Sequence, residues 1–177
     1  MKNRTKMIAL AISATAILFT TKVKAQTTDP NKFRLGIGLE AGAPTGNAHD
    51  FSNFELGGTA RLQYGLSSNL ALTLTSGYYN LFAKDQIING VTVQPNSLGI
   101  VPLKAGIKAF FASNLYFGAE AGAAFETNSG GSTKLDLSPG LGFANKTWDV
   151  GVRYENFSGQ GNSYGLVGLR IAYGFQL

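Results

Sequence analysis

Residues 115–126 read Leu-Tyr-Phe-Gly-Ala-Glu-Ala-Gly-Ala-Ala-Phe-Glu, and an apolar residue occupies every odd position of this stretch. The even positions hold Tyr116, Gly118, Glu120, Gly122, Ala124 and Glu126. A period of two residues is typical of a β-strand, because successive side chains of a strand point to opposite faces. The stretch therefore predicts a strand with one apolar face and one polar, glycine-containing face.

The same alternation recurs from residue 33 to residue 177, and clusters of Gly, Asn, Ser and Thr separate the alternating stretches. The eight predicted strands are Phe33–Ala43, Phe54–Tyr64, Leu70–Tyr79, Leu98–Phe111, Leu115–Glu126, Thr133–Ala144, Trp148–Phe157 and Tyr164–Leu177. No helical pattern interrupts the second half, and no run of 18 apolar residues follows the N-terminal segment. The sequence therefore predicts an all-β fold.

The connections between the predicted strands alternate in length. The short ones are Gly65–Asn69, Ala112–Asn114 and Asn145–Lys146, and the longer ones are Pro44–Asn53, Asn80–Ser97, Thr127–Ser132 and Ser158–Ser163. Outer-membrane barrels have this sidedness, with tight turns on the periplasmic side and extended loops outside. Within the second long connection, Ile87–Val93 predicts a small hairpin that extends beyond the membrane.

Two prolines fall inside predicted strands, Pro102 and Pro139. A closed barrel has no edge strand, and each proline removes one hydrogen-bond donor from the ladder. We expect a bulge or a local kink at each proline.

Charged residues occupy only one face of the predicted strands. The 14 charged residues within the strands all have the parity opposite to the apolar row, and seven are basic and seven acidic. They are Arg34, Glu40, Glu55, Arg61, Lys104, Lys108, Glu120, Glu126, Lys134, Asp136, Asp149, Arg153, Glu155 and Arg170. A hairpin centred on Gly130 would place Glu126 across from Lys134, as a cross-strand pair.

The charged row faces water in a soluble barrel and the lumen in a membrane barrel. Its many glycines are disfavoured on a solvated strand face but fit the crowded lumen of a narrow barrel. Buried charges must be paired, and the balance of seven to seven meets that requirement. We therefore predict an eight-stranded antiparallel up-and-down transmembrane β-barrel; a soluble periplasmic barrel is the alternative.

Aromatic residues of the apolar row lie near the strand ends. Phe33, Tyr64, Phe111, Phe117, Phe143, Trp148 and Phe175 lie next to the short turns, and Phe54, Tyr78, Phe125 and Tyr154 lie next to the long connections. Amphipathic rings favour the headgroup level of a bilayer, so the two sets are predicted to form aromatic girdles. General enrichment of aromatic residues in strands is the alternative explanation.

The N-terminal segment carries the whole net charge of +5, since residues 26–177 hold ten basic and ten acidic residues. Residues 1–25 have a basic start and an apolar run, Met7–Phe19, that is too short to span a bilayer. We predict a signal peptide at 1–25 that is cleaved between Ala25 and Gln26, a periplasmic lead at 26–32 and a barrel at 33–177. The neutral remainder argues against nucleic-acid binding.

The chain resembles the small eight-stranded outer-membrane barrels of the OmpA transmembrane domain and OmpX type over nearly all of residues 30–177. Besides the strand count and loop alternation, the ending Arg170-Ile-Ala-Tyr-Gly-Phe-Gln-Leu177 is similar to the terminal strand signal of such proteins, although it finishes on Leu instead of Phe. The resemblance implies contact with outer-membrane lipid, recognition by the barrel assembly machinery, a monomer and two periplasmic termini. Because the sequence ends at the eighth predicted strand, we expect no peptidoglycan-binding domain of the kind that OmpA carries.

Catalytic and metal-binding signals are sparse. The absence of Cys excludes a thiol nucleophile, a disulfide and a Cys-based zinc site, and one His cannot supply a usual zinc set. His49 and Ser52 lie close in sequence and could form a His/Ser arrangement at the membrane surface, although a solvated loop His is commoner. We expect no catalytic residue, metal or cofactor.

Three functions remain open at this stage. The first is a structural, envelope-integrity or surface-interaction role for a barrel whose polar lumen acts as a core. The second is a narrow channel or small-ligand barrel, which the glycine-rich lumen suggests. The third is a lipid-modifying outer-membrane enzyme that uses His49 and Ser52.

Overall fold

The computed structural model describes residues 29–88, 91–93 and 95–177, which form a closed antiparallel barrel of eight strands. The barrel strands are β1 (Phe33–Thr45), β2 (Ser52–Ser67), β3 (Leu70–Ala83), β6 (Leu98–Phe110), β7 (Leu115–Glu126), β8 (Thr133–Ala144), β9 (Trp148–Gly159) and β10 (Asn162–Gln176). Consecutive barrel strands pair with each other, and β1 closes against β10 with Glu40 opposite Arg170. The predicted eight-stranded up-and-down barrel is confirmed.

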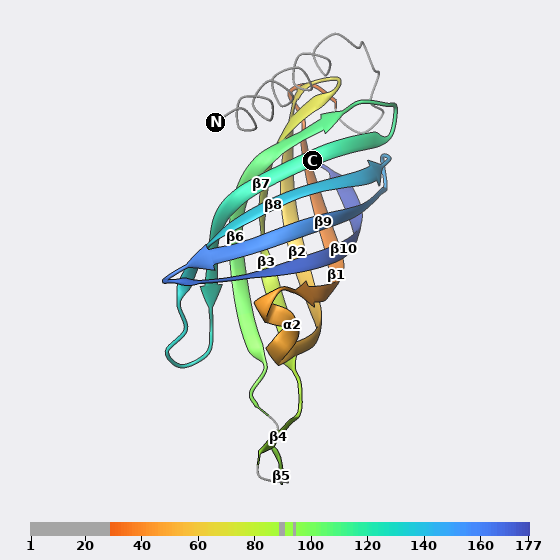
Figure 1. Ribbon diagram of the computed structural model, residues 1–177. Coiled ribbons are helices and arrows are strands. Elements are labelled where there is room, and N and C mark those ends of the chain that lie inside the picture. Colours follow the sequence, from red (N-terminus) through yellow and green to blue (C-terminus); the bar gives the residue numbers. More distant parts are fainter. Residues whose placement is uncertain (1–28, 89–90, 94) are drawn as a thin grey trace, which may run out of the picture.

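The two ends of the barrel differ (Figure 1). The turn end carries the short connections 68–69, 111–114 and 145–147 together with the C-terminus. The opposite end, the loop end, carries the helix α2 (Asn47–Phe51), the hairpin of β4 (Gln86–Ile88) and β5 (Val91–Val93), and the connection 127–132. The predicted signal peptide, its cleavage site and the first part of the lead lie outside the described residues.

The fourth long connection differs from the prediction. β9 and β10 pair as far as Gly159 and Asn162, so a two-residue turn replaces the expected loop at Ser158–Ser163. Gln160 and Gly161 have φ values of 53° and 78°, the left-handed region that a type I′ hairpin turn requires at both central positions. The polar residues expected to form the loop instead continue the ladder.

The first long connection contains a helix that the alternation pattern did not predict. α2 spans five residues and buries Ala48 at the mouth of the barrel. The predicted hairpin in the second long connection is confirmed, since β4 pairs with β5. No helix in the described part of the chain has the length and apolar character needed to cross a membrane.

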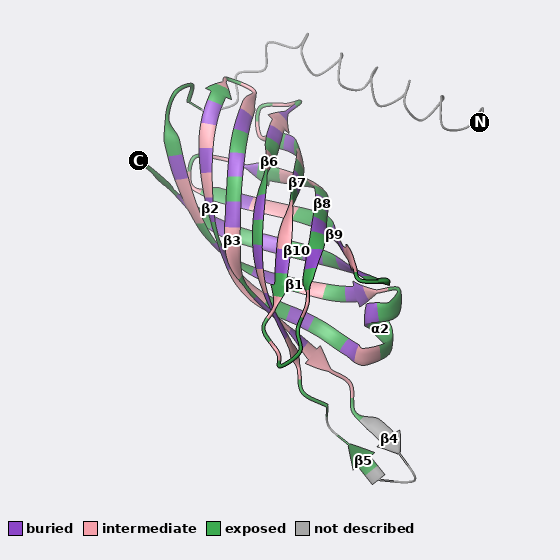
Figure 2. Ribbon diagram, turned by 90° about the vertical axis from the view of Figure 1, so that its left-hand side faces the viewer, coloured by how far each residue is buried: buried purple, intermediate pink, exposed green. Residues whose placement is uncertain are grey.

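Burial alternates along every barrel strand, as the purple and green bands of Figure 2 show. The apolar row points outward, and Leu39 in the middle of β1 is 76% exposed. A soluble barrel would bury this row, because water penalises exposed apolar area. The outward apolar row therefore favours the membrane barrel over the soluble alternative.

Of the bulge or local kink expected at each strand proline, the bulge is absent at both Pro102 and Pro139, and the kink stays a prediction. The register between β3 and β6 is the same on both sides of Pro102, and so is the register between β8 and β9 on both sides of Pro139. The ladder instead lacks pairs beside each proline: β6 and β3 are unpaired between Leu103–Ser76 and Ile100–Tyr79, and β8 and β9 are unpaired between Leu137–Asn156 and Gly140–Arg153. Each proline lacks an N–H group, so the ladder loses residue pairs locally without gaining an extra residue. Register shifts occur elsewhere, in the β2–β3 ladder at Ser52/Phe54 and Gly65/Ser67.

Candidate functional site: a charged lumen between two apolar clusters

Side chains of the charged row fill the middle of the barrel. Thirteen of the 14 charged residues predicted for the lumen are buried, and Glu126, at the loop end of β7, is half-buried. Because successive side chains of a strand point to opposite faces, the charged residues of a strand lie on the same side of the wall as most of its glycines. The contacts divide most of these residues into two clusters.

The acid-rich cluster lies toward the loop end and consists of Glu40, Glu55, Lys104, Asp136, Arg153 and Glu155. Lys104 forms ion pairs with Glu155 and, at 3.4 Å, with Asp136. Arg153 pairs with Glu40 and, through Nε at 3.0 Å, with Glu155.

Glu55 stands apart in the acid-rich cluster. It is 1% exposed, and neither carboxylate oxygen has a hydrogen-bond partner among the described residues. The cluster therefore contains one more buried carboxylate than its two bases hold in direct contact.

The base-rich cluster lies toward the turn end and consists of Arg34, Arg61, Lys108, Glu120, Asp149 and Arg170. Arg61 Nη2 donates to Glu120 at 2.9 Å, and Glu120 also accepts hydrogen bonds from Thr73 and Thr75. Asp149 forms an ion pair with Lys108 and accepts a hydrogen bond of 2.7 Å from the Tyr116 hydroxyl.

Arg170 connects the two clusters. Its Nε lies 3.4 Å from Glu40 Oε1, and its Nη1 lies 3.8 Å from Asp149 Oδ2. The hydroxyl of Thr59 joins the same group, because it donates to Glu40 and accepts from Arg170 Nε. Apart from Glu55, Arg34 and the Lys134–Glu126 pair at the rim, the charged residues of the lumen are thus connected through ion pairs along the barrel axis.

The seven bases and seven acids are unevenly distributed along the barrel axis. The acid-rich cluster has four acids and two bases, and the base-rich cluster has two acids and four bases. The remaining pair lies at the loop-end rim, where Lys134 Nζ is 3.9 Å from Glu126 Oε1. The two luminal clusters therefore carry formal charges of opposite sign.

Apolar side chains fill the lumen on either side of the charged clusters. At the loop end Ala48, Tyr79, Leu81, Ile100, Ala124, Phe157, Tyr164 and Leu166 pack together, with Phe51 and Leu98 against them. At the turn end Phe110, Tyr116 and Ala144 pack together. The loop-end apolar cluster includes α2, whose Phe51 ring meets the Tyr164 ring edge to face at 5.9 Å.

Two of the cavities lined by described residues adjoin the charged clusters. One of about 30 Å³ is lined by residues that include Arg61, Lys108 and Glu120, and one of about 10 Å³ by residues that include Arg34, Arg61 and Arg170. A water molecule needs about 10–15 Å³, so each of these spaces has room for one or a few occupants of the size of water.

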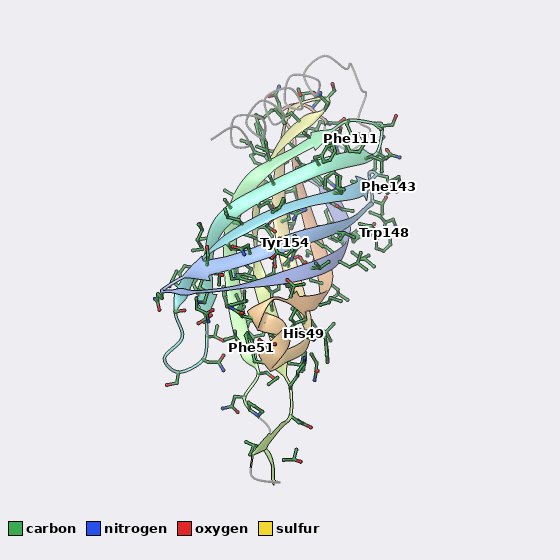
Figure 3. The ribbon with its side chains drawn as sticks, in the orientation of Figure 1. His49, Phe51, Phe111, Phe143, Trp148 and Tyr154 are labelled. Atoms are coloured by element: carbon green, nitrogen blue, oxygen red, sulfur yellow. The ribbon has the colours of Figure 1, made fainter. Side chains whose placement is uncertain are left out.

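The residues predicted to form the girdles lie on the outer wall. Ten of the eleven are 37–48% exposed, and Tyr64 is half-buried against Phe33, with ring centroids 4.8 Å apart. Figure 3 shows Phe111, Phe143 and Trp148 near the turn end, with Tyr154 nearer the loop end. Phe111 also packs against Phe117, with ring centroids 4.5 Å apart and the rings tilted by 38°.

His49 and Ser52 are not brought together as a catalytic pair. His49 is exposed on α2 (Figure 3), whereas Ser52 is fully buried and its Oγ donates to the carbonyl oxygen of Phe82 at 2.9 Å. The His49 carbonyl oxygen accepts a hydrogen bond from Lys84. Across the described ranges, no group of three or more His, Cys, Asp or Glu side chains could hold a metal ion.

Two tyrosines belong to the luminal network although they carry no charge. Tyr79 accepts a hydrogen bond of 2.8 Å from Arg153 Nη2, and Tyr116 donates to Asp149. Both tyrosines share the parity of the charged row, which is the sequence signal that places them in the lumen. The partners that they meet across the barrel carry no such signal.

No protein-family model matches the chain, and no curated protein matches it in sequence. Among solved structures it is similar to Ail, the attachment invasion locus protein of Yersinia pestis, with a TM-score of 0.59 and 14% identity over 83% of this chain and 100% of that one. It is also similar to the N-terminal β-barrel domain of Pseudomonas aeruginosa OprF, with a TM-score of 0.56 and 16% identity over 82% and 98%.

A third similar structure is the outer membrane protein OprG from Pseudomonas aeruginosa, with a TM-score of 0.52 and 10% identity over 86% of this chain and 99% of that one. At these identities the likeness concerns the fold. It agrees with the closed eight-stranded barrel and the outward apolar wall described above. The chain is thus a small eight-stranded antiparallel β-barrel of the outer-membrane type.

Proposed function

We propose that the protein is an integral, non-enzymatic protein of the bacterial outer membrane, with a closed barrel and a structural, envelope-integrity or surface-interaction role. The observation that carries this proposal is the filled lumen, in which ion-paired side chains lie between two apolar clusters. An open channel needs a continuous water path, and the cavities beside these charges hold only one or a few waters.

The outward face supports insertion into lipid. Aliphatic residues such as Leu39, Leu74 and Leu169 are exposed between the two sets of outward aromatic rings. Lipid tails cover such a surface at no cost, and the rings match the two headgroup levels. Outer-membrane lipid is therefore the proposed partner of the outer wall. The barrel assembly machinery is the proposed partner of β10, and the protein is proposed to be a monomer.

Conductance tests the closed barrel. The purified, refolded protein is added to a planar bilayer, with a general porin as the positive control. Because the lumen is filled, we expect no ion-selective openings. Reproducible openings in proportion to the amount of folded protein would favour the narrow channel instead.

The proposed orientation places both termini in the periplasm and the loop end outside. Short turns and the C-terminus share one end of the barrel, while α2 and the β4–β5 hairpin project from the other (Figure 1). An epitope inserted at Gly130 should bind antibody on intact cells, and one inserted at Lys146 should bind only after permeabilisation. The reverse result would overturn the orientation.

The loop end is also the surface from which an interaction role would operate. The β4–β5 hairpin extends well beyond the barrel rim in Figure 1, and Ail, a barrel of similar fold, is described as an attachment invasion locus protein. Deleting residues 86–93 should leave the heat-modifiable folded barrel intact while reducing adhesion of expressing cells to a host-cell monolayer. Unchanged adhesion would leave the structural or envelope-integrity role as the proposal.

A further inference from the structure

A buried arginine in the base-rich cluster has no counter-charge in contact with it. Arg34 is 8% exposed, and its Nε and Nη2 atoms are buried without a hydrogen-bond partner among the described residues. Arg170 Nη1 likewise has no hydrogen-bond partner. A guanidinium is always charged, so burial without an anion is costly and cannot be relieved by loss of a proton.

The two acids of the base-rich cluster are already engaged. Asp149 is held by Lys108 and the Tyr116 hydroxyl, and it lies 4.0 Å from Arg61 Nη1 and 3.8 Å from Arg170 Nη1, beyond hydrogen-bond distance. Glu120 accepts from Arg61, Thr73 and Thr75. Neither carboxylate is free to hold Arg34.

The acid-rich cluster reaches Arg170 through Glu40 but does not supply a partner for Arg34. Its unpartnered member, Glu55, lies opposite Gly42 on β1, eight positions from Arg34 on the same strand. Eight residues of strand span roughly 26 Å at about 3.3 Å per residue. An excess of positive charge therefore remains local to the turn-end half of the lumen.

The unpartnered nitrogens border a small cavity. Its volume is about 10 Å³, and the guanidinium-bearing residues Arg34, Arg61 and Arg170 line it together with Gly174. A Cβ atom on Gly174 would lie 2.1 Å from Arg34 Nη2 and 2.2 Å from Nε, so the glycine leaves room for the guanidinium in this position. Asp149 also lines the cavity, and its charge is directed to the partners named above.

We propose that this cavity is a binding site for one small inorganic anion of chloride size, held by Arg34, Arg61 and Arg170. Three guanidiniums supply strong donors for an anion, and the small space has room for a single occupant. The size of the cavity excludes phosphate, sulfate and organic carboxylates. The anion offsets the excess positive charge and keeps Arg34 buried.

Bromide diffraction tests the site on the unaltered protein. Crystals of the full refolded chain grown or soaked in sodium bromide should show an anomalous peak within about 3.5 Å of the guanidinium nitrogens of Arg34, a normal contact distance for a charged N–H donor to a large anion. A water molecule without an anomalous signal in the cavity would overturn the proposal. An anomalous peak confined to the outer surface would overturn it equally.

Chloride-35 line broadening of the detergent-folded protein provides a second, solution readout. The wild type should broaden the chloride line in proportion to protein concentration, and added bromide should displace this effect. Gly174→Ala crowds Arg34 and should reduce the displaceable broadening at least fivefold, as should Arg34→Gln. The matched control is Gly168→Ala on the same strand, whose Cβ meets atoms no closer than 3.8 Å and which should behave as wild type.

The gel-mobility shift on boiling shows which variants have folded. If Arg34→Gln fails to fold, Gly174→Ala and the bromide peak of the wild type decide the question. Equal displaceable broadening in the wild type and in folded Gly174→Ala would contradict the site. The conductance of the barrel is a separate measurement, so an absent anion site does not by itself contradict the closed barrel.

Discussion

The two halves of the lumen have opposite charge and share one architecture. Toward the loop end, two bases hold three of the four acids, and Glu55 is left without a partner. Toward the turn end, two acids contact three of the four bases, and Arg34 is left without a counter-charge in contact with it. A balanced total of luminal charges therefore does not make each half of the lumen balanced, because a buried charge is compensated only by neighbours within a few ångströms.

In each half of the lumen, the charged residues that are in the minority should contribute most to the free energy of unfolding. In the base-rich cluster that is Asp149, which faces Lys108, Arg61, Arg170 and the Tyr116 hydroxyl. We expect Asp149→Asn to lower the free energy of unfolding by about 3–5 kcal/mol, because it leaves buried bases uncompensated. Urea unfolding in lipid vesicles, followed by circular dichroism and gel mobility, measures the change.

The control for this substitution is Asp85→Asn, at an exposed site outside the barrel strands, which should change the free energy of unfolding by no more than about 0.5 kcal/mol. If the two substitutions have equal effects, the charges of the base-rich cluster do not depend on Asp149.

Crowding Tyr116 at the turn end should have a smaller effect on the free energy of unfolding. A Cβ atom on Gly142 would lie 2.3 Å from Tyr116 Oη, so Gly142→Ala forces the ring away from Asp149. We expect a loss of about 1–3 kcal/mol in the same unfolding measurement. Gly118→Ala is the matched control, because its Cβ would meet the same ring at an ordinary 3.6 Å; a similar loss in the control would show that strand glycines matter for another reason.

Removing the unpartnered acid of the acid-rich cluster should stabilise the protein, in contrast to the two substitutions above. We expect Glu55→Gln to raise the free energy of unfolding by about 1 kcal/mol, since it removes a buried charge that has no partner. Glu40→Gln, the control in the same cluster, should lower it, because Arg153 and Arg170 then lose a counter-charge. Destabilisation by both substitutions to the same extent would show that Glu55 has a compensating partner.

The smallest effect is expected at the rim, outside both clusters. Glu126 is half-buried and 3.9 Å from Lys134, and it also accepts hydrogen bonds from Ser132 and Tyr164. A double-mutant cycle of Glu126→Gln and Lys134→Met should give a coupling below about 1 kcal/mol. A coupling as large as the loss for Asp149→Asn would place this pair with the buried network.

Much of the wall could be predicted from local pattern. The alternation around Glu120 or Arg153 fixes which side chains leave the wall on the same side, since the period of a strand is two residues. The same parity placed Tyr79 and Tyr116 on the polar face. Connection lengths were less predictable: polar residues around Gln160 can form either a loop or a continued ladder with a tight turn, and α2 is too short to produce a periodic signal.

The number of strands, the inward face of each strand and the equal numbers of inward-facing acids and bases follow from the sequence alone, because they depend on a two-residue period and a count. The contacts of Lys104 with Glu155 and of Lys108 with Asp149, and the lack of partners for Glu55 and Arg34, are visible only in the folded barrel. These contacts depend on the closure of β1 against β10 and on the relative stagger of strands distant in sequence. Parity places a charge inside the barrel, and barrel closure determines its height and its neighbours.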